Sequence, residues 1–571
     1  MSLETKSQEL KDLVSTYDTQ WFLGDLSGLM KAIANGAAQD QLGKLSSPLR
    51  QLYFLGGLLV STDSKNKNDT QYTLEKWGQI VTLLNEIERE YDKLFFPKPD
   101  EEIDEEWKKI RKVAMPSFLS YFNQGPLNYE EQTISWVKNL YSEIDETIEC
   151  ETGLVTVDFI NFYNNLDSLV QSNFQGFSSP NGVIRPDWEN YTKMPVVPAE
   201  NMPAIMIDMF EERKPLMTFM ADHGIINRFT PEDLVSDELP LEKVNGILQL
   251  ILCKREPKDF LYYTSTRPSN PLYEFPIIEI GDGLYQVFEV KQVIHAIDAL
   301  LERVCSKEAK AKNKLVDQKG KLLERKIIDI FKKFFKKDYQ YFESYYVDGY
   351  EQDILFLWKN HAFIIEAKGY NLREPMRNPN KAFVKIKDDF KSCIGYGYTQ
   401  TKRVEEKFID QIPLRIEDKY GNLIEEIDTT KYEGNDFSII VNINSFGQIQ
   451  NDLSTLLEIG EDNVFPWVIK LDDLETFLLT MIATKKTPNN FIDYLILREE
   501  LHGKLICSDE LEVCGGYLNG VITEKKIKKI DKLVTTPDLP SIFDEQYNKG
   551  MGFEDEKSLA EKKSGRYMFW G

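Results

Sequence analysis

Two acidic side chains and one lysine in the second half of the chain have the types and spacing that a metal site needs. The segment EQDILFLWKNHAFIIEAK (351–368) has the composition of two strands joined by a turn at 359–360. With a two-residue turn there, Asp353 lies directly opposite Glu366, and the Cβ atoms of such a pair are about 4.5–5.5 Å apart. Lys368 shares their face because strand side chains alternate. Adjacent carboxylates repel each other unless a cation lies between them, so the pattern predicts a Mg²⁺ or Mn²⁺ site with Lys368 beside it.

Helices are expected on both sides of this hairpin, and each carries one polar side chain in an apolar row. In residues 322–335, Glu324 falls in line with apolar side chains at spacings of three and four residues. A carboxylate in such a row is costly to bury unless it is paired or binds a metal ion. In residues 381–408, Gln400 is the single polar side chain on an apolar face. Both polar side chains are therefore candidates for the same site.

Together these residues resemble the PD-(D/E)XK nuclease superfamily. The resemblance implies that Asp353 and Glu366, the first residue of the E-x-K triplet, bind Mg²⁺, and that Lys368 positions or activates the attacking water. It also implies that Glu324, on the preceding helix, and Gln400, on the following helix, complete the catalytic site. The chain departs from the most common form of the motif, because no proline precedes Asp353.

This resemblance covers only residues 305–485, for which it implies a restriction-endonuclease-like α/β core with a central mixed sheet. The remaining composition predicts a multidomain α plus α/β protein with a helical N-terminal half. We expect a helical domain over 1–195, a mixed α/β connecting domain over 196–304 and a C-terminal extension over 486–571. The last 30 residues or so are polar and contain glycine, so they are expected to be peripheral.

The charge distribution indicates where nucleic acid would bind. The chain has 69 Lys and Arg against 93 Asp and Glu, a net charge of -24, and as a whole should repel phosphate. Basic residues are nevertheless concentrated in 302–337 and 368–407, whose local net charges are +8 and +5. Such stretches are either solvated helix faces or places where the nucleic-acid backbone, DNA rather than RNA, is bound. The basic residues expected to bind it are Lys332, Lys333, Lys336, Lys337, Arg373, Arg377, Lys402 and Arg403.

Two other interpretations of the hairpin charges stay open. The register that pairs Asp353 with Glu366 also pairs Lys368 with Glu351, and these charges could form an ordinary surface ion network worth about 1 kcal/mol or less. A nuclease-like fold that has lost catalysis, and only binds nucleic acid or serves as a scaffold, would carry the same residues. Metal-dependent cleavage distinguishes these interpretations from a working nuclease.

Several other classes of protein are excluded or unsupported. No apolar run approaches the 20 or so residues of a membrane-spanning helix, and the N-terminus lacks the layout of a secretory signal, so a cytoplasmic protein is expected. No phosphate-binding loop of the form G-x-x-x-x-G-K-[ST] and no CxxC pair occurs. By analogy alone, a large chain with one such domain suggests a bacterial restriction or antiphage-defence effector. Its helical N-terminal half is open to sensing, homo-oligomerisation or binding of a partner protein.

Overall fold

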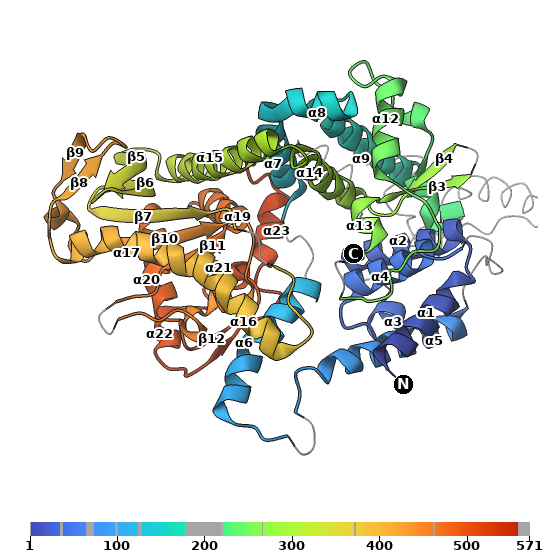
Figure 1. Ribbon diagram of the computed structural model, residues 1–571, viewed down its shortest axis with the longest axis horizontal. Helices are drawn as coiled ribbons and strands as arrows, with labels where there is room; N and C mark the ends of the chain where they lie inside the picture. Colours follow the sequence, from blue (N-terminus) through green and yellow to red (C-terminus); the bar gives the residue numbers. More distant parts are fainter. Residues whose placement is uncertain are drawn as a thin grey trace, which may run out of the picture. The chain divides into compact units, whose positions relative to one another are not determined.

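A computed structural model of the chain divides it into two compact units, which are described separately (Figure 1). Unit 1 comprises Met1–Lys93, Thr133–Leu315 and Lys557–Gly571, and unit 2 comprises Leu94–Gln132 and Val316–Glu556. The expected helical N-terminal half and C-terminal α/β region are confirmed. Among the described residues, no helix is long and apolar enough to cross a membrane. The structure describes residues 2–34, 38–63, 73–97, 101–123, 128–178, 218–219, 221–264, 267–281, 283–370, 373–460 and 463–557.

Unit 1 is mostly helical and has a small four-stranded sheet of order β1-β4-β3-β2. Ten consecutive residues of helix α4, from Gln51 to Val60, are buried, as expected for a helix that is apolar on all sides and lies in a core. Strands β3 and β4 of this sheet are paired antiparallel with each other. The elements of unit 1 are α1 (Leu3–Ser15), α2 (Thr19–Ala34), α3 (Gln39–Leu42), α4 (Pro48–Val60), α5 (Leu74–Asp92), α7 (Glu130–Tyr141, which begins in unit 2), α8 (Asp145–Thr152), α9 (Thr156–Ser178), β1 (Arg228–Phe229), α12 (Leu241–Ile251), β2 (Leu252–Cys253), α13 (Pro271–Glu274), β3 (Ile277–Gly281), β4 (Leu284–Val287) and α14 (Val290–Cys305).

Unit 2 is built on a seven-stranded mixed sheet of order β11-β10-β7-β6-β5-β8-β9 (Figure 1). Strand β6 is antiparallel to both β5 and β7, whereas β10 is parallel to both β7 and β11. The sequence interpretation missed β5, β8 and β9. The seven strands are β5 (Tyr339–Val347), β6 (Tyr350–Trp358), β7 (His361–Lys368), β8 (Leu414–Glu417), β9 (Leu423–Ile427), β10 (Asp436–Asn442) and β11 (Trp467–Lys470).

Helices cover both faces of this sheet. On one face, the ring of Phe331 in helix α15 lies 5.3 Å from that of Phe356 and 6.0 Å from that of Phe363. On the other face, Val404 of helix α17 packs in a buried cluster with Leu355 and other strand residues. The other elements of unit 2 are α6 (Glu105–Asn123), α15 (Ala309–Phe335, which begins in unit 1), α16 (Pro379–Phe390), α17 (Tyr396–Ile409), α18 (Gln448–Asn451), α19 (Leu471–Ala483), α20 (Pro488–Glu499), β12 (Leu505–Ile506), α21 (Glu510–Leu518), α22 (Glu524–Ile527), β13 (Leu533–Val534) and α23 (Ser541–Tyr547).

Helix α6 reaches unit 2 from the N-terminal part of the chain. It packs against α16 and α18. The approach beside α18 is close: a Cβ atom on Gly447 would lie 2.5 Å from the Ser120 hydroxyl oxygen, and Gly447 has a φ of +58°. Both the crowding and the left-handed backbone therefore require glycine at this position. Unit 2 thus includes a helix that lies far from the rest of the unit in the sequence.

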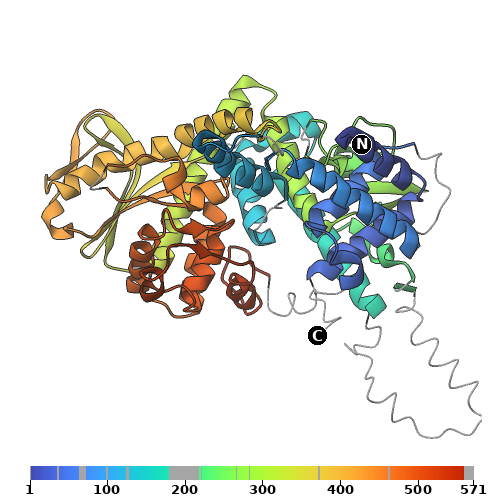
Figure 2. The same ribbon diagram turned by 90° about the horizontal axis from the view of Figure 1, so that it is seen from below.

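Residues 486–556 of the expected C-terminal extension fall in unit 2, and residues 557–571 fall in unit 1. The predicted boundary at 485/486 falls inside this unit, the one at 304/305 lies near its start at residue 316, and the one at 195/196 lies outside the described residues. Helices α19, α21 and α23 pack against one another in a single group (Figure 2). Phe543 and Phe553 are buried, so the expectation that the last 30 residues are peripheral is wrong as far as residue 557. Apolar side chains spaced among the polar ones give this segment its core.

A buried ion pair connects α20 to α21 in this group. The guanidinium of Arg498 donates to the Glu510 carboxylate from Nε at 2.8 Å and from a terminal nitrogen at 3.0 Å. The same carboxylate accepts from the indole N–H of Trp467 at 2.8 Å and the hydroxyl of Tyr494 at 2.7 Å. Because both charged groups are buried, removal of either one leaves the other without compensation.

We expect Arg498→Met to lower the free energy of unfolding of unit 2 by about 3–5 kcal/mol, because it leaves the Glu510 carboxylate buried without its cation. Urea-induced unfolding followed by tryptophan fluorescence measures this, since Trp467 shares the carboxylate. Lys528→Met is the control: it breaks an exposed pair with Glu524 on α22 and should leave the free energy of unfolding nearly unchanged. Equal losses in the two variants would contradict the assignment of Arg498 as a buried structural cation.

Candidate functional site

Asp353, Glu366 and Lys368 meet at one end of the β6–β7 hairpin. The register runs from Trp358↔His361 to Ile354↔Ile365, which confirms the predicted two-residue turn. The Lys368 ammonium lies 2.6 Å from Glu366 Oε2 and 3.3 Å from Asp353 Oδ2. The predicted proximity of the two carboxylates and the lysine is therefore observed.

Lys368 was expected to pair with Glu351 across the hairpin, but its ammonium contacts Glu366 and Asp353 instead. On the side of Ile354 away from the turn, hydrogen bonds to side chains replace those between the two backbones. The Ala367 amide donates to Asp353 Oδ2 at 2.7 Å, and the Asp353 amide lies 3.4 Å from Glu366 Oε1. Glu351 pairs across β5 with Tyr346, and its side chain is exposed. The local departure of β6 from β7 thus directs the Lys368 ammonium to the two carboxylates instead.

The protonation of this cluster follows from its burial. Burial raises the pKa of Glu366 to about 8, and the neighbouring charge of Asp353 contributes to the increase against the opposing effect of Lys368. Burial alone would lower the pKa of Lys368, but the carboxylates of Glu366 and Asp353 outweigh it and raise that pKa. Near neutral pH, one proton on Glu366 therefore allows Asp353 and Lys368 to form a compensated pair. A divalent cation entering the site would take the place of that proton.

Helix α15 places Glu324 next to the cluster, as the helical periodicity predicted. Burial raises the pKa of Glu324 to about 7, and the second cause is the charge of Asp353. The hydroxyl of Ser344 donates to Glu324 at 3.4 Å. Ser344 has a φ of +46°, and it interrupts the β5–β6 register opposite Asp353. This irregular strand position had no recognisable signal in the sequence, because serine is not a typical left-handed residue.

Helix α17 places Gln400 over the start of β6. Its amide nitrogen donates to the Glu351 carbonyl at 3.5 Å, while its side-chain oxygen is buried and has no hydrogen-bond partner within the described part of the chain. The side-chain oxygen of Gln352 is in the same situation, and its amide nitrogen donates to the same carbonyl at 2.8 Å. Both side-chain oxygens are therefore buried acceptors without a donor among the described residues.

A glycine brings this helix close to the lysine of the cluster. A Cβ atom on Gly397 would lie 3.2 Å from Lys368 Cε and 3.2 Å from Ile440 Cδ1, which is tighter than ordinary packing. The absence of a side chain at this position leaves the space through which the Lys368 side chain passes. The sequence interpretation placed Gly397 on the apolar face of this helix, and its proximity to the lysine explains its small size.

The expected basic residues are divided between the two ends of the hairpin. Lys332, Lys333, Lys336 and Lys337 follow one another at the end of α15, where the ring of Phe335 lies 5.4 Å from that of Trp358 beside the turn. Trp358 is five residues from Asp353, so this end of β6 is roughly 16 Å from the carboxylates at about 3.3 Å per residue. These four lysines can bind only nucleic acid that extends well beyond the site.

The other four basic residues lie on the segment after β7 and on helix α17. Arg373 and Arg377 follow β7, and the Arg373 guanidinium donates from Nε at 2.6 Å to the buried carboxylate of Asp389 on α16. This bond gives Arg373 a structural role in holding the segment after β7. Lys402 and Arg403 lie on α17, one turn beyond Gln400, where Lys402 is 3.7 Å from Glu406. The cations of α17 are therefore the best placed of the eight for a molecule at the site.

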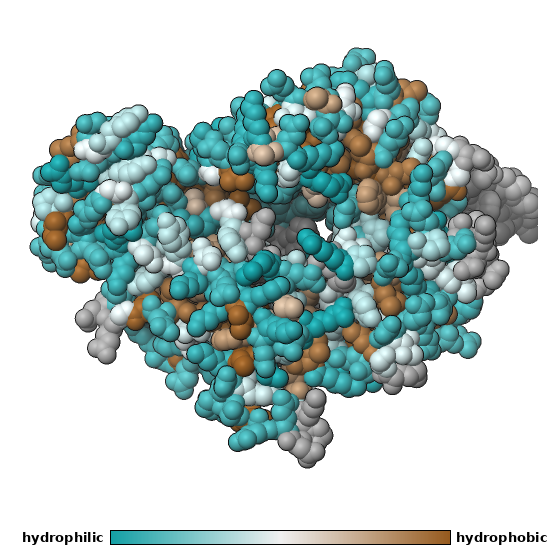
Figure 3. Space-filling view, viewed as in Figure 1, coloured by the Kyte–Doolittle hydropathy of each residue, from teal (hydrophilic) through white to brown (hydrophobic). Residues whose placement is uncertain are grey.

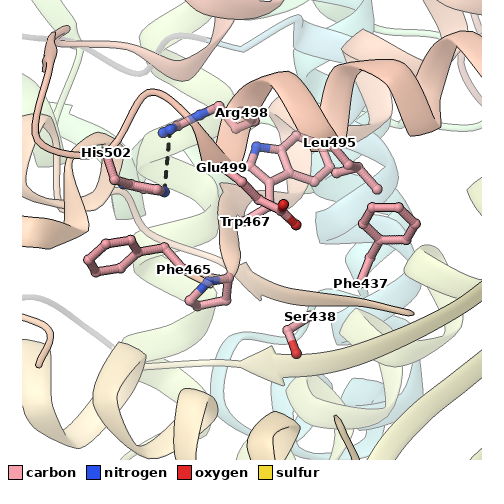
Figure 4. Close-up of a pocket in the computed structure, with 9 residues that line it drawn as sticks. Phe437, Ser438, Phe465, Trp467, Leu495, Arg498, Glu499 and His502 are labelled. Atoms are coloured by element: carbon pink, nitrogen blue, oxygen red, sulfur yellow. Dashed lines mark hydrogen bonds between the residues drawn. The ribbon is translucent and has the colours of Figure 1, made fainter. Parts of the chain in front are cut away.

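A second feature of unit 2 is a pocket lined by β10, the residues before β11, and α20 (Figure 4). Burial raises the pKa of Glu499, one of its lining residues, to about 8, with the charges of Glu405 and Asp436 contributing. Ser438, in this pocket, pairs in register with Ile364, whereas Glu366 pairs with Ile440. The pocket thus lies nearer the opposite end of β10 and does not include the Asp353 and Glu366 carboxylates.

The residues present fit a hard divalent cation at the hairpin site. Among the described residues, no group of three or more His, Cys, Asp or Glu side chains is placed to hold a metal ion. Mg²⁺, however, is commonly bound through one or two carboxylates, with water and substrate phosphate supplying the other ligands. Asp353 and Glu366 offer two carboxylates at one strand end, so they meet this lower requirement.

Comparison with known proteins adds no assignment. No family model, no curated protein and no solved structure matches this chain. The functional interpretation therefore depends on the geometry and chemistry of the described residues.

The raised pKa of Glu366 predicts how pH affects stability without metal. The pKa of Glu366 is about 8 in the folded chain and about 4.3 in the unfolded chain. The contribution of this carboxyl group to the free energy of unfolding is therefore fully present below pH 4 and is lost as pH rises to 8. Relative to Glu366→Gln, the parent should lose up to about 1.4 kcal/mol of unfolding free energy per pH unit in this range. Denaturant unfolding from pH 5 to 9 in the presence of a chelator measures the difference, with exposed Glu426→Gln as control. A constant difference between the parent and Glu366→Gln would contradict the assignment of a buried, protonated carboxyl group.

Proposed function

We propose that unit 2 is a metal-dependent nuclease that hydrolyses DNA phosphodiester bonds. The single observation that carries the proposal is the convergence of Asp353, Glu366 and Lys368 at the end of one hairpin, with the ammonium within 3.3 Å of both carboxylates. Two carboxylates suited to Mg²⁺ or Mn²⁺ and a lysine suited to phosphate charge form a set that phosphodiester hydrolysis can use.

Each residue has a role that its surroundings allow. Asp353 and Glu366 would hold the cation, which when bound supplies Lewis-acid stabilisation of the phosphate charge. Lys368, buried and held as an ammonium, would orient the attacking water and offset the negative charge that develops. Glu324 has a pKa of about 7 and can therefore accept a proton at neutral pH. The unpartnered oxygen of Gln400 would accept a hydrogen bond from the nucleotide.

The order of elements around these residues supports the resemblance to the PD-(D/E)XK superfamily. Glu324 comes from the helix before the strands, Asp353 and the Glu366-Ala367-Lys368 triplet come from paired strands of a mixed sheet, and Gln400 comes from the next long helix. This is the arrangement that the resemblance implies, in a region that overlaps the expected range of 305–485. A role in restriction or antiphage defence is an extension of this proposal by analogy.

A non-catalytic nucleic-acid-binding or scaffold protein is the second candidate function. The observation that favours it is that Lys368 already contacts both Asp353 and Glu366, so with one proton on Glu366 the cluster is compensated without a metal ion. In that case Mg²⁺ would change neither the integrity of DNA nor the affinity for it. Cleavage in the presence of Mg²⁺ distinguishes the two functions.

We expect Asp353→Asn and Glu366→Ala each to reduce Mg²⁺-dependent plasmid cleavage by at least about 100-fold, because either change leaves a single carboxylate for the cation. The control is Glu351→Ala, which removes an exposed carboxylate two residues from Asp353 and should cleave like the parent. Circular dichroism establishes that the three variants are folded. Parental rates in both site variants would place the chemistry elsewhere or refute nuclease activity.

The positions of the basic residues predict which of them affect binding. Neutralising Lys402 and Arg403 together should weaken DNA binding and reduce the slope of log affinity against log salt by roughly 0.7–0.9 for each phosphate that is no longer neutralised. Neutralising Lys336 and Lys337, which lie at the turn end of the hairpin, should have a smaller effect on a short DNA. Fluorescence anisotropy at several salt concentrations measures both. A larger effect of the Lys336 and Lys337 pair would locate the DNA near the hairpin turn.

A further inference from the structure

Two tyrosine rings project from the surface around the hairpin site and have no role in the chemistry described above. Tyr396, at the start of α17, and Tyr350, at the start of β6, are each 58% exposed. Both are among the most exposed large side chains of unit 2. Exposure of a single ring of this size to water costs little free energy. Two such rings beside a buried charge cluster, however, indicate a binding surface.

Each ring already has a cation against it. The Arg403 guanidinium lies 4.0 Å from the centre of the Tyr350 ring, and the Lys368 ammonium lies 5.7 Å from the centre of the Tyr396 ring. A cation on one side of a ring leaves the other side available for a flat partner. The same cations can pair with the phosphates that link such partners.

The two rings are held in place by the elements that form the site. Tyr350 follows a tight turn at Asp348 and Gly349, whose φ angles are +52° and +81°, and Asp348 is tied to α17 by Lys407 at 2.8 Å. Along α17, Tyr396 and Arg403 are separated by seven residues, or about 10 Å at 1.5 Å per residue. Gln400, with its unpartnered acceptor oxygen, lies between them.

We infer that the substrate of this site is single-stranded DNA, or an unpaired end or flap, whose bases stack on Tyr350 and Tyr396 on either side of the Gln400 oxygen. This inference rests on the proposed nuclease function and specifies its substrate class. Only unpaired bases can offer a ring face, because those of a duplex are already stacked on one another. The side-chain oxygen of Gln400, which has no hydrogen-bond partner among the described residues, can accept from the amino group of a base.

The test compares a short single strand with a duplex of the same sequence, both labelled, using the full-length chain without Mg²⁺. Tyr350→Leu and Tyr396→Leu should each weaken single-strand binding by roughly 5- to 150-fold, the usual effect of losing one stacked base, and leave duplex binding unchanged. Tyr420→Leu is the matched control. Its ring is 77% exposed and has the Lys419 ammonium 5.0 Å from its centre, but it lies in the turn between β8 and β9. A 5-iodouracil placed in the single strand should crosslink to Tyr350 or Tyr396.

The inference is overturned if the duplex binds as tightly as the single strand, or if the Tyr350 and Tyr396 variants bind the single strand like the Tyr420 control. Cleavage of a duplex plasmid that depends on Asp353, together with either result, would leave the proposed nuclease function in place and remove only the substrate class. Single-strand binding that depends on both tyrosines, without any Mg²⁺-dependent cleavage, would support this inference and refute the nuclease function instead.

Discussion

The sharing of one ammonium ion by Asp353 and a protonated Glu366 is the constraint on which the rest of unit 2 depends. Glu366 is fully buried, and beside Asp353 it would be strongly destabilising without the Lys368 cation at 2.6 Å. The strand pairing of β6 with β7 extends from the turn only as far as Ile354. At the preceding residue, the Asp353 carboxylate accepts a hydrogen bond from the Ala367 amide, which takes the place of a strand partner. The same residues therefore form the hydrogen bonds at this end of the sheet and balance its charges.

The apolar body of the hairpin makes this arrangement rigid. From residue 354 to the turn, both strands are buried between α15 on one face and α17 on the other. The two helices cover the carboxylates less completely, so Asp353 and Lys368 retain partial exposure. On the face viewed in Figure 3, hydrophilic residues predominate and apolar ones are scattered.

Local patterns in the sequence predicted the residues of the site better than their surroundings. A two-residue turn fixes which strand residues oppose each other, and helical spacing identifies a polar residue in an apolar row, so the positions of Asp353, Glu366, Glu324 and Gln400 followed from short-range rules. Strand β5 was missed because only Tyr345 and Val347 are buried in it, which obscures the alternation. The tyrosines at 350 and 396 carried no signal, since the exposure of a ring depends on tertiary packing.

The position of α6 in the sequence has a consequence for how the protein is made. This helix belongs to unit 2, yet it is synthesised before most of unit 1, and its partner α16 follows about 250 residues later. At a rate of synthesis of roughly 5–20 residues per second, the apolar side of α6 stays uncovered for roughly 10–50 s until the helix that buries it has been synthesised. During that interval it is exposed to chaperones and to other nascent chains. Unit 2 cannot be completed until almost the entire chain has emerged, so a product truncated before residue 447 would present an unfinished α/β unit and leave the Ser120 side chain without the Gly447 backbone that it approaches.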